Sequence, residues 1–172
     1  MSKDRLPVLE IVGVVPSPAY PKLWDGHKHE AVVLEDYVVT KATEGQQRYQ
    51  HILITDAMQR IPVQEAQRLL ERIRANLVPG GRLHLIVPAM EWACRQLLLD
   101  SPNPVVYQFI WGAHTSPQAC WHGGYTMRML RTLLESAGYD VKRAATNQVL
   151  KEFAGYKPFS ASYHALEAEP RQ

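Results

Sequence analysis

Residues 51–88, HILITDAMQRIPVQEAQRLLERIRANLVPGGRLHLIVP, decide the fold of this chain. The segment 51–55 is a short apolar run with β-branched residues, which is typical of a buried strand. Pro62 stands where the first turn of a helix tolerates proline, and the Pro-Gly-Gly sequence at 79–81 ends that helix. The segment 83–87 is a second apolar strand. Strand, crossover helix and strand form a βαβ unit, so this stretch predicts a parallel sheet.

The predicted helix between the two strands is amphipathic. Its apolar stripe recurs at spacings of three and four residues and comprises Ala66, Leu69, Leu70, Ile73 and Leu77. The positions expected to face water are Gln64, Glu65, Arg68, Glu71, Arg72 and Arg74. We therefore expect one face of this helix to pack on the sheet.

Further elements are expected on both sides of this unit. Apolar, β-branched runs predict strands at 8–15, 31–40, 140–145 and 163–169, and apolar spacing predicts helices at 90–99 and 125–137. The segment 101–124 is rich in proline and aromatic residues, and we expect it to be an irregular loop of the long, functional kind.

Bulk properties indicate one ordinary globular domain spanning residues 1–172. The net charge of +2 gives no indication of a nucleic-acid partner. No apolar run approaches the roughly 18 residues of a membrane span. Cys94 and Cys120 stand at unrelated spacing, so we expect small buried side chains in a reducing compartment, the cytoplasm.

Several motifs resemble the class I S-adenosylmethionine-dependent methyltransferases, and are closest to their small "predicted methyltransferase" branch. They are TDAMQRIP at 55–62, LVPGGRL at 77–83, IVP at 86–88, HGGY at 122–125 and LRTLLESAGY at 130–139. The resemblance implies an α/β fold, an abbreviated Rossmann-like, doubly wound and mostly parallel sheet with a C-terminal antiparallel strand. It also implies S-adenosylmethionine as the cofactor.

In such a fold the cofactor lies across the carboxyl ends of the first strands, where the strand order reverses. The segment LEIVG at 9–13 matches only the opening of the family's glycine-rich motif, with Glu10 in its acidic position and Gly13 as its first glycine. Val14-Val15-Pro16-Ser17 replaces the remaining glycines, and β-branched side chains would crowd the ligand. Cofactor binding is therefore expected to be weakened or lost.

The other cofactor contacts are expected after later strands. Glu35 or Asp36 would receive the ribose hydroxyls, and Asp56 would lie near the reaction centre. The family's third strand is not evident, because only residues 37–50 separate the second predicted strand from the next.

His122 is the candidate general base, because imidazole titrates near neutral pH. The alternative is a histidine that orders the long loop by hydrogen bonding. The ligand types of His114, Cys120 and His122, with His27 or His29, suit zinc, but their spacing matches no usual zinc pattern. We therefore expect no metal.

Two functions remain open. One is a small methyltransferase of unknown acceptor. The other is a catalytically silent methyltransferase-like protein that serves as a binding or assembly subunit in a larger viral or cellular complex. In either case we expect the aromatic loop 107–125, with Trp111 and Trp121, to carry the contact surface for an acceptor, a protein partner or a second copy.

Overall fold

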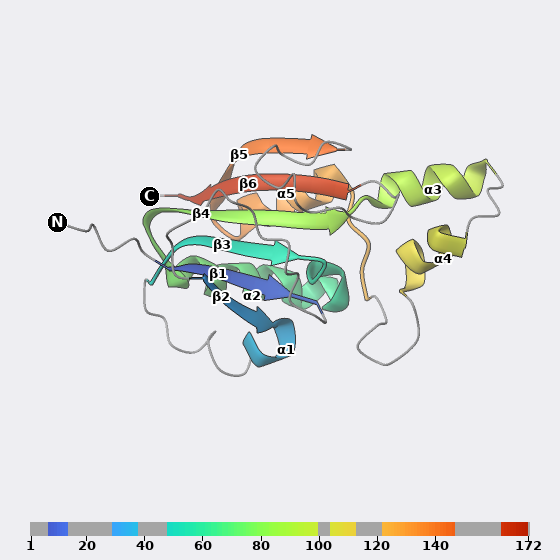
Figure 1. Ribbon diagram of the computed structural model, residues 1–172. Helices are drawn as coiled ribbons and strands as arrows, with labels where there is room; N and C mark the ends of the chain where they lie inside the picture. The colour runs from blue at the N-terminus through green and yellow to red at the C-terminus, as the bar shows by residue number, and fades with distance from the viewer. Residues whose placement is uncertain are drawn as a thin grey trace.

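The computed structural model describes residues 7–13, 29–37, 48–99, 104–112, 122–146 and 163–171. They form a six-stranded sheet with the strand order β2-β1-β3-β4-β6-β5, and helices pack against it (Figure 1). The strands are β1 Val8–Val12, β2 His29–Val33, β3 Tyr49–Thr55, β4 Leu77–Pro88, β5 Tyr139–Thr146 and β6 Tyr163–Pro170. The helices are α1 Leu34–Asp36, the 3-10 turn η3 Met58–Arg60, α2 Val63–Asn76, α3 Met90–Leu98, α4 Pro104–Trp111 and α5 Met127–Ser136.

The topology confirms the predicted parallel unit and the fold class. Strands β3 and β4 are parallel neighbours joined by α2, with Ile52 opposite Leu83. Strand β1 pairs in parallel with both β2 and β3. Strand β6 inserts antiparallel between β4 and β5. The sheet is therefore mostly parallel with an antiparallel strand from the C-terminal end of the chain, as expected. Within the described ranges no strand lies beyond β2, where a third family strand would pair.

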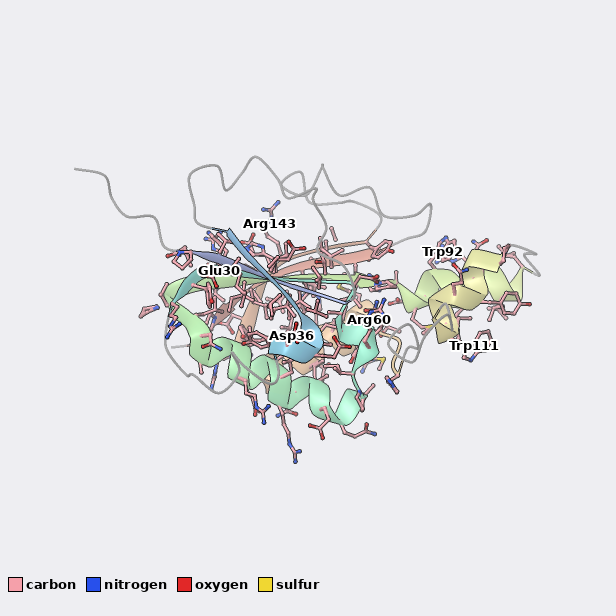
Figure 2. All side chains as sticks on the ribbon, turned by 60° about the horizontal axis from the view of Figure 1, so that its bottom comes forward. Glu30, Asp36, Arg60, Trp92, Trp111 and Arg143 are labelled. Carbon is pink, nitrogen blue, oxygen red and sulfur yellow. The ribbon has the colours of Figure 1, made fainter. Side chains whose placement is uncertain are left out.

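The core lies between the sheet and the two helices α2 and α5. The side chains of Ile52, Ile54 and Leu85 alternate along β3 and β4 onto this face and are buried. They pack with the predicted helix stripe, of which Leu70 and Ile73 are fully buried. Leu77, predicted as the last member of that stripe, instead begins β4. Both helices lie on the same face, and α2 is seen below the sheet in Figure 2. The described helices thus cover one sheet face, whereas a doubly wound sheet has helices on two.

The second sheet face is buried and more polar. It carries Glu10, Leu53, Thr55, His84 and Ile86, each at most 6% exposed. Thr55 donates a hydrogen bond from Oγ1 to Oε1 of Glu10 over 3.2 Å, across neighbouring strands. This pairing explains how a carboxyl group is accommodated in the middle of β1.

Two of the predicted segments are wrong in their boundaries. The strand expected at 31–40 ends at Val33, and the chain turns into α1. Leu34 and Tyr37, three residues apart, both point into the core, and a helical turn allows this while an extended strand does not. The turn expected at 79–81 is an outward bulge within β4. Tyr49 of β3 pairs with Leu77 of β4, and the next paired residues are His51 and Arg82, so β4 has the longer stretch between the same two pairs.

The segment expected to be an irregular loop at 101–124 contains a helix, α4, which packs along α3. Its sequence PVVYQFIW has no glycine and begins with proline, which the first helical turn accepts. Figure 1 shows α3 and α4 extending beyond the end of β4. Because α3 leaves the sheet, Cys94 is exposed and not buried as predicted, and Leu98 is 87% exposed. Cys120 lies outside the described residues.

Among the described residues, no helix is both long enough and apolar enough to cross a membrane.

Candidate functional site

The strand order reverses between β1 and β3. The chain passes from β1 to its neighbour β2 and then returns to the other side of β1. Because β1 and β3 are parallel, their carboxyl ends meet at one edge of the sheet, with Gly13 following β1 and Asp56 following β3. Ligands of open α/β sheets bind in the crevice at such a position.

Asp56 has a strained backbone that its neighbours hold in place. It is the one residue other than glycine with a positive φ, 51°, among those described. Its N–H donates to the carbonyl of Ile86 over 3.1 Å, and its carbonyl accepts from Nε of Arg60 over 3.0 Å. Aspartate tolerates this conformation better than most residues. Held strain of this kind concentrates at functional sites, so it points to a role for this turn.

The Asp56 side chain is 37% exposed. Gln59 donates from Nε2 to Oδ1 over 2.5 Å, and Nη2 of Arg60 lies 3.8 Å from Oδ2. Burial against the protein raises the pKa of Asp56, and the Arg60 charge and the Gln59 hydrogen bond oppose that rise. The group is thus an acceptor that can also hold a proton nearer to neutral pH than an exposed aspartate.

Gln59 was not singled out in the sequence, although it stands inside the motif at 55–62. Its side chain is buried, 1% exposed, and its Oε1 has no hydrogen-bond partner among the described residues. An ionised carboxylate only accepts, so the bond to Asp56 fixes which end of the amide is NH₂ and leaves the carbonyl end as the unsatisfied one. A buried acceptor without a donor is costly in free energy of folding.

Arg60 was also missed, and it lies over Gly13. A Cβ at Gly13 would collide with the Arg60 side chain and with the backbone oxygen of Asp56. The Arg60 side chain is only 10% exposed. Gly13 is therefore needed for close packing of the β1 and β3 ends, whatever it contributes to a ligand.

His122 lies beside the same turn. Its backbone N–H donates to the carbonyl of Gln59 over 2.7 Å, and the N–H of Gly123 donates to the same oxygen over 3.2 Å. The His122 side chain is exposed. The buried side chain of Tyr125 also contacts this turn: its hydroxyl donates to the Met58 carbonyl over 3.5 Å. Burial raises the pKa of Tyr125 to about 12. The structure thus places Gly13, Asp56 and the backbone of His122 around one turn.

The three remaining predicted residues lie in two other places. Glu35 and Asp36 are exposed on α1, directly after β2, at the same edge of the sheet (Asp36 is labelled in Figure 2). Glu10 lies inside β1 and is fully buried, and its Oε1 accepts from Thr55. The role of Glu10 in cofactor binding stays a prediction. So do the roles predicted for the other site residues, Gly13, Glu35, Asp36, Asp56 and His122.

Most candidate ligands of the zinc alternative fall outside the part of the chain that the structure describes. His114, Cys120 and His27 lie outside the described residues, as does the side chain of His29. In the part of the chain that is described, no group of three metal-ligating side chains occurs.

No protein-family model and no curated protein matches the sequence. Solved structures do match. The 1,6-didemethyltoxoflavin-N1-methyltransferase of Burkholderia thailandensis is 18% identical, with a TM-score of 0.62 over 98% of this chain and 72% of that one. A methyltransferase of Methanosarcina mazei is 13% identical, with a TM-score of 0.60 over 98% and 94% of the two chains.

The magnesium protoporphyrin IX methyltransferase of Synechocystis is 14% identical, with a TM-score of 0.59 over 98% of this chain and 75% of that one. The structures from Burkholderia and Synechocystis both contain S-adenosylhomocysteine. At these identities the likeness concerns the fold. The strand order, the crossover helix and the similar solved structures agree: this chain has the fold of the class I S-adenosylmethionine-dependent methyltransferases.

Proposed function

We propose that this protein binds S-adenosylmethionine at the carboxyl ends of β1 and β3 and transfers its methyl group to a small acceptor. The observation that carries the proposal is the held, positive-φ turn at Asp56, which presents a carboxylate beside Gly13 where the strand order reverses. Solved relatives of the same fold contain S-adenosylhomocysteine, which adds support from outside the chain.

The residues present fit the polar parts of this cofactor. Glu35 and Asp36 are exposed carboxylates after β2 and suit the two ribose hydroxyls, which are hydrogen-bond donors. Gly13 and Asp56 lie at the neighbouring strand ends and suit the methionine end. When bound, the cofactor supplies an activated methyl group on a sulfonium centre. His122, exposed beside the turn, is the candidate base for an acceptor proton.

The acceptor region is proposed to lie under α3 and α4, at the same end of the sheet. Tyr107 and Trp111 stack on α4 with ring centroids 5.8 Å apart, and each side chain is about half exposed (Trp111 is labelled in Figure 2). Helix α4 carries no charged side chain. Such a surface favours an uncharged, flat acceptor.

A second candidate function is a catalytically silent binding subunit. The observation that favours it is the packing of Arg60 over Gly13, which fills space beside the glycine with protein atoms. If these atoms fill the ligand crevice, the protein keeps the sheet without binding a cofactor and would serve as a binding subunit.

Calorimetric titration with S-adenosylmethionine and S-adenosylhomocysteine tests the proposal. Binding should occur, and Glu35→Ala or Asp36→Ala should weaken it by about 1–3 kcal/mol, the scale of a lost hydrogen bond to a charged group. Glu65→Ala, an exposed acidic residue on α2, is the matched control and should bind like the parent. Absence of binding by either ligand at millimolar concentration would overturn the proposal and leave the silent subunit.

A further inference from the structure

Three polar side chains meet at the edge of the sheet where β4 and β5 end and β6 begins (Figure 1). Thr146 ends β5, His164 lies at the start of β6, and Glu91 lies in the first turn of α3. Thr146 and His164 are directly opposite each other in the strand register, so their side chains lie on the same face of the sheet. Strand β4 lies between this group and β3, and it separates the group from the turn at Asp56.

The imidazole ring of His164 is held between the other two side chains. Its Nε2 lies 2.6 Å from Oε2 of Glu91, and its Nδ1 lies 2.9 Å from Oγ1 of Thr146. The other carboxylate oxygen of Glu91 accepts from the N–H of Met127 over 2.8 Å, which fixes the carboxylate at both ends. An ionised carboxylate only accepts, so in the neutral imidazole Nε2 carries the proton and Nδ1 accepts from the Thr146 hydroxyl.

We propose that Thr146 is the nucleophile and His164 the general base of an esterase site, with Glu91 as the residue that positions the imidazole. A hydroxyl group, an imidazole and a carboxylate hydrogen-bonded in this order form the relay of serine hydrolases, which is recognised by its geometry and roles on unrelated folds. This activity is separate from the proposed methyl transfer and requires no S-adenosylmethionine.

The three side chains differ in exposure as such a relay requires. Thr146 is exposed, so the carbonyl group of a substrate can reach its hydroxyl. His164 is 1% exposed, and the absence of bulk water around its ring strengthens both of its hydrogen bonds. Burial would raise the pKa of Glu91, but hydrogen bonds from its own backbone, Met127 and His164 lower it. The carboxylate therefore stays ionised beside a protonated imidazole.

The reaction has two steps that these groups can carry. Oγ1 of Thr146 bonds to the carbonyl carbon of an ester while its proton passes to Nδ1 of His164. The bond from that carbon to the alkoxy oxygen breaks, and the alcohol leaves with the proton. Water then attacks the acyl-threonine ester in the same way, which releases the carboxylic acid and restores the hydroxyl. The methyl group of threonine crowds its hydroxyl, so the expected substrates are esters of small carboxylic acids.

Two probes test the site, para-nitrophenyl acetate and a fluorophosphonate. The parent should release nitrophenolate with an initial burst, and peptide mapping by mass spectrometry should place the acetyl and phosphonyl adducts on Thr146. Thr146→Val removes the hydroxyl at nearly constant shape and should abolish the burst and both adducts. Thr146→Ser keeps a hydroxyl and should retain them. His164→Gln should lower kcat by about a hundredfold or more.

Glu91→Gln tests the positioning role. Its amide can donate to Nε2 of His164 and leave the proton on Nδ1, which is the wrong tautomer for a base. It should slow acetylation of Thr146 and lower kcat with KM unchanged in a protein that remains folded, and Glu91→Asp should regain part of the rate. A purely structural contact would lower the melting temperature of Glu91→Gln and leave the acetylation rate of the folded protein as in the parent.

The controls separate this site from background reactivity. Thr132→Val removes an exposed threonine on α5 and should hydrolyse the ester like the parent. Thermal unfolding identifies any variant that does not fold, and if His164→Gln fails to fold, the comparison of Thr146→Val with Thr146→Ser decides. The proposal is overturned if neither probe modifies Thr146 in the parent, if Thr146→Val hydrolyses the ester at the parent's rate, or if a folded His164→Gln variant is modified at Thr146 as fast as the parent. Each of these outcomes is independent of cofactor binding, so the proposed methyl transfer stands or fails separately.

Discussion

Asp56 shows how one residue combines several constraints at the end of a strand. The end of β3 must stop pairing, turn sharply and stay close to Gly13, and a left-handed aspartate does all three. Its backbone is fixed by Ile86 and Arg60, while its carboxyl group stays partly exposed. The strain is therefore held by packing and leaves the side chain available for chemistry.

The raised pKa of Asp56 has a defined effect on stability. Folding favours the protonated form, so this stabilisation is fully present below the ordinary value of 3.8 and is lost as pH rises through the folded pKa. Asp56→Asn keeps the shape and tolerates the positive φ but does not titrate. We expect the variant to gain stability relative to the parent as pH rises from about 4 to about 7 in urea unfolding.

Asp140→Asn is the control with the opposite sign. The hydrogen bond from Arg171 lowers the pKa of Asp140, so its contribution is present above 3.8 and is lost as pH falls. The free energy of unfolding of Asp140→Asn should therefore fall relative to that of the parent over the same rise in pH. If Asp56→Asn behaves like Asp140→Asn, the Asp56 carboxyl group is stabilised in its ionised form and our account of its burial is wrong.

At the scale of elements, α2 is attached by a stripe of apolar side chains and not by its charges. Leu70 is fully buried against the sheet, and truncation to Ala should cost about 2–5 kcal/mol because a cavity remains. Leu98→Ala makes the same chemical change at a position that is 87% exposed and should stay within about 0.5 kcal/mol of the parent. Urea denaturation of the two variants measures the difference, and equal losses would contradict the packing.

Helix α3 is attached differently, through one carboxylate at its first turn. Glu91 accepts from the N–H of Met127 over 2.8 Å and pairs with Nε2 of His164 over 2.6 Å. His164 is 1% exposed, and its Nδ1 pairs with Oγ1 of Thr146 over 2.9 Å. A single side chain thus joins α3 to β6 and to the start of α5.

The pKa of Glu91 is lowered, because burial would raise it but the hydrogen bonds from its own backbone, Met127 and His164 outweigh that effect. Its stabilisation is present above 4.5 and is lost as pH falls through the folded pKa. Glu91→Gln should cost about 1 kcal/mol at neutral pH, a modest value because the side chain is 42% exposed. The difference from the parent should vanish in acid, and a constant difference from neutral to acid pH would argue against the charged contact.

At the scale of the whole molecule, exposed apolar residues gather on the α3–α4 extension. Its exposed members are Leu97, Leu98, Leu99, Tyr107 and Trp111, against Val63 and Met129 among the described residues elsewhere. This exposed apolar surface begins earlier in the chain than the contact surface predicted at 107–125, which stays a prediction. Concentrated exposed apolar surface marks interaction sites on soluble proteins.

We expect this extension to mediate self-association in addition to covering an acceptor. Sedimentation velocity at rising protein concentration should show association, and Leu98→Asp should reduce it. Glu71→Ala, on the exposed side of α2, is the control and should associate like the parent. A monomer at all concentrations, with Trp111→Ala affecting acceptor binding alone, would limit this surface to the proposed acceptor region.

The sequence by itself determined the sheet unit and its covering helix. Residues 51–88 carry apolar runs and a 3.6-residue stripe, and these local periodicities reflect burial directly, so β3, α2 and β4 form as predicted. Gly138 follows Ala137, the C-cap of α5, and has a φ of 83°. The sequence indicates a helix end there too, because a left-handed residue after a helix is usually glycine. Asp56 could be placed at a strand end because the apolar run 51–55 stops there. Glu35 and Asp36 fell inside the strand predicted at 31–40, and they follow a strand only because β2 ends at Val33.

Only the tertiary structure decided what lies beside those strand ends. The packing of Arg60 over Gly13 and the hydrogen bond from Gln59 to Asp56 depend on contacts between β1, β3 and the η3 turn. No local sequence pattern encodes these contacts. The sequence analysis missed three further features for a related reason: the bulge in β4, the helix α4 and the exposure of Cys94. Each depends on whether a neighbouring element covers the segment, and burial by distant parts of the chain overrides local propensity.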